Sequence, residues 1–151
     1  MAIRKLLVAN RGEIAVRIVR AARDLGIETI QAHSDADADS LAVRLADEAV
    51  NIGPPQAAKS YLNIKAIVEA AQEAGADAVH PGYGFLAESS HFADAVEAAG
   101  MAFVGPRGET IRMMGDKVAA RTAAMNAGVP TIPGSDGRIN DVAEAEKLAV
   151  E

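Results

Sequence analysis

Two short apolar runs, with one amphipathic segment between them, constrain the fold of this chain more than any other feature. The runs cover residues 3–9 (IRKLLVA) and 27–32 (IETIQA), and each has the length of a buried strand. The segment between them predicts a helix that ends at Gly26, with an inner face made of Ile14, Ile18, Ala21, Ala22 and Leu25. A strand, a helix and a second strand in this order predict a parallel sheet.

The same alternation of strands and helices continues along the chain. Short apolar runs predict further strands at residues 49–52, 76–79 and 101–104. Helical spacing predicts helices at residues 41–46 and 64–74, a helix that opens at Glu88 or Ser89, and helices at residues 109–114 and 116–127. The sequence therefore predicts an α/β fold in which helices flank a parallel sheet.

Composition and charge exclude several classes of protein. With 3% aromatic residues and no Trp, the core must consist of Ala, Val, Ile and Leu, and the absence of Cys excludes disulfides and thiolate zinc sites. The net charge of −6 argues against nucleic-acid binding. No apolar run reaches the roughly 18 residues that span a bilayer, and the N-terminus has no signal-peptide layout. We therefore expect a cytoplasmic protein with no membrane or nucleic-acid partner.

The loop after the first predicted strand lacks the glycines of a dinucleotide site. That site needs G-x-G-x-x-G, and residues 10–13 (NRGE) supply only Gly12. Glu13 also places a negative charge where a phosphate would lie at the helix N-terminus. A P-loop motif is absent as well. The usual mode of NAD binding is therefore not predicted, and the sequence shows no metal-ligand spacing either.

Residues 80–88 (HPGYGFLAE) form the most informative loop. Two glycines around Tyr83 permit a tight turn that exposes the ring, which would suit a ligand. An ordinary strand-to-helix loop with Phe85 in the core explains the same residues, and His80 fits either a packing or a ligand role. Further along, Asp116 is the predicted N-cap of a helix, and Lys117 then lies in its first turn, where a cation is unfavourable.

Four motifs taken together resemble the N-terminal part of biotin carboxylase. In chain order they are VANRGEIA (residues 8–15), KSYLN (59–63), HPGYGFLAE (80–88) and MGDK (114–117). Biotin carboxylase occurs as a subunit of acetyl-CoA carboxylase and as a domain of propionyl-CoA and pyruvate carboxylases. The resemblance implies carboxylation of biotin by bicarbonate, driven by ATP through carboxyphosphate.

The resemblance also assigns roles to particular residues. Lys117 matches a lysine that contacts ATP, where an ammonium neutralises phosphate charge. Tyr83 and Gly84 match the loop on the biotin side of the active site, and Glu88 borders that loop without an assigned chemical role. Arg20 and Asp24 match positions on the homodimer face. No catalytic residue and no metal ligand is assigned within the chain.

The family's architecture implies a Rossmann-like (pre-ATP-grasp) domain at residues 1–114 and the opening helices of an incomplete ATP-grasp region at residues 115–151, including a helix at residues 142–150. The complete enzyme uses ATP, Mg²⁺ and biotin. Its partners are a biotin carboxyl carrier protein or domain, a carboxyltransferase and a second copy of itself. The glycine-rich lid, the Mg²⁺-binding acidic residues and the bicarbonate-binding arginines are expected beyond Glu151, so the chain alone is predicted to be inactive. The alternative hypothesis is a stand-alone Rossmann-like binding or dimerisation module without catalysis.

Overall fold

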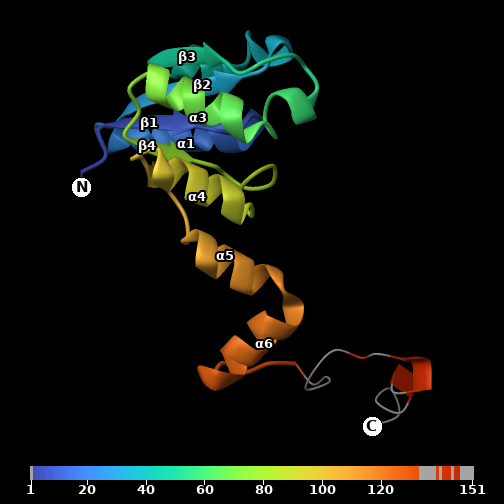
Figure 1. The fold of residues 1–151 in the computed structure, drawn as a ribbon. Helices are drawn as coiled ribbons and strands as arrows, with labels where there is room; N and C mark the ends of the chain where they lie inside the picture. The colour runs from blue at the N-terminus through green and yellow to red at the C-terminus, as the bar shows by residue number, and fades with distance from the viewer. Residues whose placement is uncertain (1, 133–138, 140, 144, 147–151) are drawn as a thin grey trace. The chain divides into compact units, whose positions relative to one another are not determined.

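The computed structural model describes residues 2–132, 139, 141–143 and 145–146 (Figure 1). It divides into two units, Met1–Ile111 and Arg112–Glu151, and each is described by itself. The domain division after residue 114 stays a prediction. The helix predicted at residues 142–150 lies largely outside the described residues.

The first unit contains a five-stranded sheet in which every paired strand is parallel. The strand order is β3-β2-β1-β4-β5, with bounds β1 Lys5–Val8, β2 Glu28–His33, β3 Glu48–Asn51, β4 Ala78–His80 and β5 Ala102–Phe103. In the register of the central strands, Leu7 of β1 lies opposite Ile30 of β2 and Val79 of β4. The predicted α/β fold with a parallel sheet is thereby confirmed.

Helices cover both faces of the sheet, which explains why the central strands β1 and β4 carry buried apolar residues on both sides. On one face, α1 (Gly12–Asp24) and α2 (Leu41–Leu45) pack against Leu6, Val8 and Ala78. On the other face, α3 (Ile64–Glu73) and α4 (Ser90–Ala98) pack against alternate residues of the same strands, including Leu7 and Val79 (Figure 1). Two short 3-10 helices, η1 (Asp35–Asp37) and η2 (Ala57–Lys59), lie in the connections.

The buried face of α1 differs from the predicted one. Its buried residues are Ala15, Ile18, Val19 and Ala22, whereas Leu25 is 75% exposed. Leu25 is the C-cap of the helix, with φ −91° and ψ 0°, so its backbone has already left the helical spiral and its side chain leaves the inner face. A helical pattern extended through the last residue before Gly26 therefore ran one residue too far at the C-terminal end of the helix.

Two helix starts in the first unit follow local sequence signals. The side chains of Asn63 and Ser89 accept hydrogen bonds from Ala66 N and Phe92 N, which caps α3 and α4. Of the two starts predicted for α4, Ser89 is thus the correct one.

The second unit begins within α5 (Gly108–Gly115) and continues into α6 (Lys117–Asn126). Asp116 Oδ1 accepts hydrogen bonds from Val118 N at 2.9 Å and Ala119 N at 3.0 Å, so the predicted N-cap is confirmed. Lys117 lies exposed in the first turn of α6, directly after this cap.

Candidate functional site

The strand order places a switch point between β1 and β4. From β1 the chain proceeds to β2 on one side, and from β4 it proceeds to β5 on the other side. In open parallel sheets, the loops that leave such a pair diverge at the carboxyl ends of the strands, where ligands commonly bind. Here those loops are residues 9–11 and residues 81–89.

Asn10 connects the two loops. Its side chain is buried, and Nδ2 donates to Pro81 O at 2.6 Å and to Tyr83 O at 2.8 Å, while Oδ1 accepts from Arg11 N at 2.9 Å. The main chain supports the same junction, because Ala9 N donates to His80 O at 2.9 Å. The loop after β4 is therefore tied to the end of β1.

The loop after β4 presents Tyr83 to solvent. Tyr83 is 61% exposed, and its hydroxyl hydrogen-bonds to the carboxylate of Glu13 in the first turn of α1. This hydrogen bond and the charge of Glu13 raise the pKa of Tyr83 above its ordinary value. The negative side chain at the start of α1 thus has a partner within the protein.

Phe85 does not enter the core as the ordinary-loop interpretation expected. It adopts φ +42°, is 38% exposed and stacks on Tyr61 with the ring centroids 5.1 Å apart. Leu86, the next residue, fills the core position instead. The turn at Phe85 therefore exchanges which of two neighbouring side chains points inward.

His80 has a structural contact at the base of this loop. Gly82 N donates to its Nδ1 at 3.0 Å, so this nitrogen carries no proton. Burial lowers the pKa of His80, which also favours the neutral form. These contacts support the packing role among the two interpretations of this histidine.

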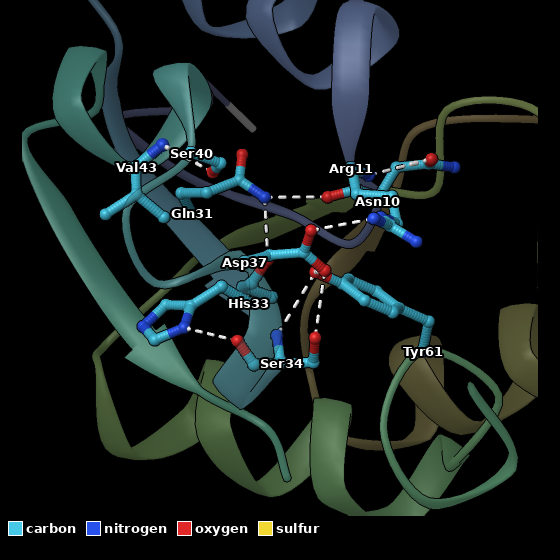
Figure 2. A network of polar contacts seen from close by, with 10 residues as sticks. Asn10, Arg11, Gln31, His33, Ser34, Asp37, Ser40, Val43 and Tyr61 are labelled. Carbon is cyan, nitrogen blue, oxygen red and sulfur yellow. Dashed lines mark hydrogen bonds and ion pairs between the residues drawn. The ribbon is translucent and has the colours of Figure 1, made fainter. Parts of the chain in front are cut away.

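A second set of side chains covers the ends of β1 and β2, as Figure 2 shows. Arg11 Nη2 pairs with Asp37 Oδ1 at 2.8 Å, and the guanidinium lies 5.9 Å from the centre of the Tyr61 ring. The Tyr61 hydroxyl donates to Asp37 Oδ2 at 2.9 Å and accepts from Ser34 N at 3.1 Å. Asp37 thereby joins three elements that are far apart in the sequence.

The environment holds Asp37 in its ionised form. Partial burial acts to raise the pKa of Asp37, but hydrogen bonds from Ser34 and Tyr61 and the charge of Arg11 outweigh it, so the pKa lies below its ordinary value. For Tyr61, burial is the main cause of a raised pKa, and the nearby Asp37 adds to it. Near neutral pH, Asp37 is therefore a carboxylate and Tyr61 a neutral phenol.

The predicted site residues lie in three places. Tyr83, Gly84 and Glu88 are exposed on the loop after β4, Arg20 and Asp24 are exposed on α1, and Lys117 belongs to the second unit. Their assigned roles stay predictions. The sequence interpretation missed the contacts of Asn10 and the Tyr61–Asp37 pair. Asn10 could have been noticed as a polar residue directly after a buried strand.

Two further observations concern metal ions and membranes. The described residues contain no group of three or more His, Asp or Glu side chains that could hold a metal ion. Within the same part of the chain, every helix is too short or too polar to span a lipid bilayer.

The sheet order and the loops at its carboxyl edge define a Rossmann-like α/β domain. A family model described as "Biotin carboxylase, N-terminal domain" matches residues 2–111. The chain belongs to this family, which confirms the resemblance drawn from the four motifs.

Known proteins similar to this chain are considerably longer. It is 56% identical over 146 residues to a biotin carboxylase of Haemophilus influenzae, covering 96% of this chain and 33% of the relative. It is 55% identical over 150 residues to the alpha subunit of mitochondrial methylcrotonoyl-CoA carboxylase of Arabidopsis thaliana, covering 97% and 20%. The chain thus spans about a third or less of these relatives.

A solved structure shows the same fold. The biotin carboxylase domain dimer of Hydrogenobacter thermophilus 2-oxoglutarate carboxylase, in complex with MgADP, ADP and bicarbonate, has a TM-score of 0.87 and 45% identity. That match covers 99% of this chain and 33% of that protein.

The two tyrosines provide a matched test of the buried network. We expect Tyr61→Phe to lower the free energy of unfolding by about 1–3 kcal/mol, because the buried Ser34 N–H loses its acceptor. Tyr83→Phe, at an exposed position, should change it by less than about 0.5 kcal/mol. Urea unfolding measures both. Equal effects of the two substitutions would contradict the role given to the Tyr61 hydroxyl.

The contact between Tyr83 and Glu13 is testable by titration. Glu13→Gln removes the negative charge that disfavours the phenolate, so the pKa of Tyr83 should fall toward its ordinary value of about 10. NMR titration of protein labelled at the tyrosine ring carbons resolves Tyr83 from Tyr61, which serves as the internal control. An unchanged pKa of Tyr83 would show that the two side chains are not in contact in solution.

Proposed function

We propose that the chain is the N-terminal part of an ATP-dependent ligase that carboxylates biotin on a carrier protein with bicarbonate. The observation that carries the proposal is the loop at residues 80–88, which is exposed at the switch point of the sheet in a chain of the biotin carboxylase family. The structural relative with MgADP and bicarbonate supports the choice of substrates. The alternative, a binding module without catalysis, has no observation of its own in its favour.

Biotin would lie against the loop that carries Tyr83, Gly84 and Glu88. The Tyr83 ring offers an exposed aromatic face and a phenol oxygen. Gly84, exposed and at φ +67°, lets a ligand approach the main chain without a side chain in between. Glu88 borders the same loop and is also exposed.

ATP does not fit the place where a dinucleotide fold binds its cofactor. At the end of β1 only Gly12 is available, Glu13 contacts Tyr83, and the Arg11–Asp37 pair covers the neighbouring strand end. A phosphate there would meet two carboxylates. We therefore place the nucleotide contact in the second unit, at the exposed ammonium of Lys117, which would neutralise phosphate charge when ATP is bound.

Mg²⁺ would need ligands other than the described residues, which form no metal-binding cluster. We infer that these ligands, and most of the groups that hold biotin and bicarbonate, belong to the additional two thirds of sequence that relatives have. The chain alone is then expected to be inactive. The proposed location is the cytoplasm, in keeping with the absence of cysteine.

Arg20 and Asp24 are proposed to form part of a homodimer face. They lie one turn apart on the exposed surface of α1 and line the same shallow hollow. Among the described residues neither makes an ion pair. Across a two-fold axis, each could pair with the opposite charge of a second copy.

The further partners proposed are a biotin carboxyl carrier protein or domain and the carboxyltransferase of an acyl-CoA or pyruvate carboxylase.

The role of Lys117 is testable in the complete carboxylase that contains this sequence. Lys117→Met should lower kcat/KM for ATP about tenfold, which is the size of one lost charge-assisted hydrogen bond. Lys65→Met is the matched control, because Lys65 is exposed on α3 and, among the described residues, pairs with Glu69 one turn away. Steady-state kinetics with free biotin measure both variants. Equal ATP dependence in the two would refute the assignment.

The dimer face has an internal control of the same kind. Asp24→Arg should raise the dimer dissociation constant of the complete carboxylase about tenfold or more, because like charges then meet across the interface. The double substitution Arg20→Asp, Asp24→Arg should restore association. Glu69→Arg, which changes an exposed carboxylate on α3, should have no effect in analytical ultracentrifugation. Dissociation by Glu69→Arg alone would place the interface elsewhere.

A further inference from the structure

At each end of the β1–β4 strand pair, a side chain from one strand region forms hydrogen bonds to the main chain of the other. At the amino end, Asp77 Oδ1 accepts from Arg4 N and Lys5 N, each at 3.1 Å. At the carboxyl end, the Asn10 amide donates to Pro81 O and Tyr83 O. The two side chains stabilise different parts of the structure. Asp77 connects the starts of the two strands, whereas Asn10 holds the loop that carries Tyr83.

Asn10 is itself held from β2. Gln31 Nε2 donates to Asn10 O at 2.7 Å and to Ala32 O at 2.6 Å, as Figure 2 shows for the Gln31–Asn10 contact. Asn10 is only 3% exposed and Gln31 only 1%. Gln31 of β2 therefore holds the main chain of Asn10, and the side-chain amide of Asn10 in turn holds the loop after β4.

The loop fits closely around this amide. A Cβ added to Gly82 would lie 2.7 Å from Asn10 Nδ2, which is too close for any side chain to be accepted there without a shift. Gly82 also adopts φ +66°, a conformation that favours glycine. The sequence Pro81-Gly82-Tyr83 thus wraps around Asn10, with one carbonyl on each side of the glycine accepting from the same nitrogen.

The Tyr83 side chain starts from a main chain that Asn10 holds. The carbonyl that accepts the 2.8 Å hydrogen bond belongs to Tyr83 itself, and the phenol at the other end of this residue reaches Glu13. The ring is exposed, so its own packing contributes little to fixing its direction. The hydrogen bond to its carbonyl holds the main chain from which the ring projects.

We propose that Asn10 is a positioning residue, which sets the main chain of residues 81–83 so that Tyr83 faces biotin in the productive direction. The inference rests on the proposed function, since it takes the loop to be the biotin side of the site. In this role Asn10 acts through the loop. It belongs to the first unit, whereas Lys117, the proposed nucleotide contact, belongs to the second.

This role predicts a selective kinetic effect. In the complete carboxylase, Asn10→Ala should raise KM for free biotin about tenfold and leave KM for ATP within about twofold of the original value. Asn10→Asp preserves the size of the side chain but turns an oxygen toward the two carbonyls, so it should raise KM for biotin further. Gly82→Ala, which displaces the loop from the opposite side, should reproduce the effect if an Asn10 variant fails to fold.

Asp77→Ala is the matched control. It removes the side-chain hydrogen bonds at the amino end of the same strand pair and should lower the midpoint of urea unfolding. The loop after β4 keeps the amide donor of Asn10. We expect KM for biotin to remain unchanged in this variant. An equal rise in KM for biotin in Asp77→Ala and Asn10→Ala would overturn the proposal, because general loss of stability would then explain both.

A second readout needs no biotin. If Asn10 holds the loop, Asn10→Ala should let Tyr83 leave Glu13, and the pKa of Tyr83 should fall toward its ordinary value in an NMR titration, whereas Asp77→Ala should leave it raised. An unchanged pKa in Asn10→Ala overturns the positioning role. A lowered pKa with an unchanged KM for biotin supports the positioning of the loop and overturns its assignment to biotin, and with it the placement of biotin under the proposed function.

Discussion

The pairing of β1 with β4 is the contact on which the rest of the first unit depends. These strands are central in the sheet, and the chain reverses its direction of travel across the sheet between them. Their carboxyl ends would diverge into two independent loops without a connection. The buried amide of Asn10 connects them through two hydrogen bonds, to Pro81 O and Tyr83 O, and a buried donor of this kind is costly to leave unpaired.

At the carboxyl edge of the sheet, side chains cover the ends of β1 and β2, whereas the loop after β4 is accessible. Over β1 and β2, the Arg11–Asp37–Tyr61 network occupies the strand ends with paired polar groups. Over β4, the loop leaves Tyr83 and Gly84 exposed. The first loop of this Rossmann-like sheet lacks the glycines of a dinucleotide site, and the second loop presents an accessible surface. In such folds the function depends on the site and not on the topology.

Under the proposed function, the first unit presents biotin, and another part of the enzyme binds the nucleotide. The charge pattern agrees with this division, because Glu13 and Asp37 make the first loop unsuitable for phosphates, while the second unit offers Lys117. The family match ends at residue 111, before this lysine, so the proposed contacts with biotin and with ATP lie in different units of the chain.

The sequence by itself determined the features that depend on neighbours in the chain. Apolar runs predicted the parallel strands, and the caps at Asn63, Ser89 and Asp116 set the helix starts, because a cap acts on an N–H two or three residues away. The motifs also identified the family. Only the tertiary structure decided that Leu86 and not Phe85 enters the core, and that Asn10 holds a loop more than seventy residues distant. Such contacts arise from the pairing of distant strands, and periodicity along the chain carries no record of which polar side chain will meet which carbonyl.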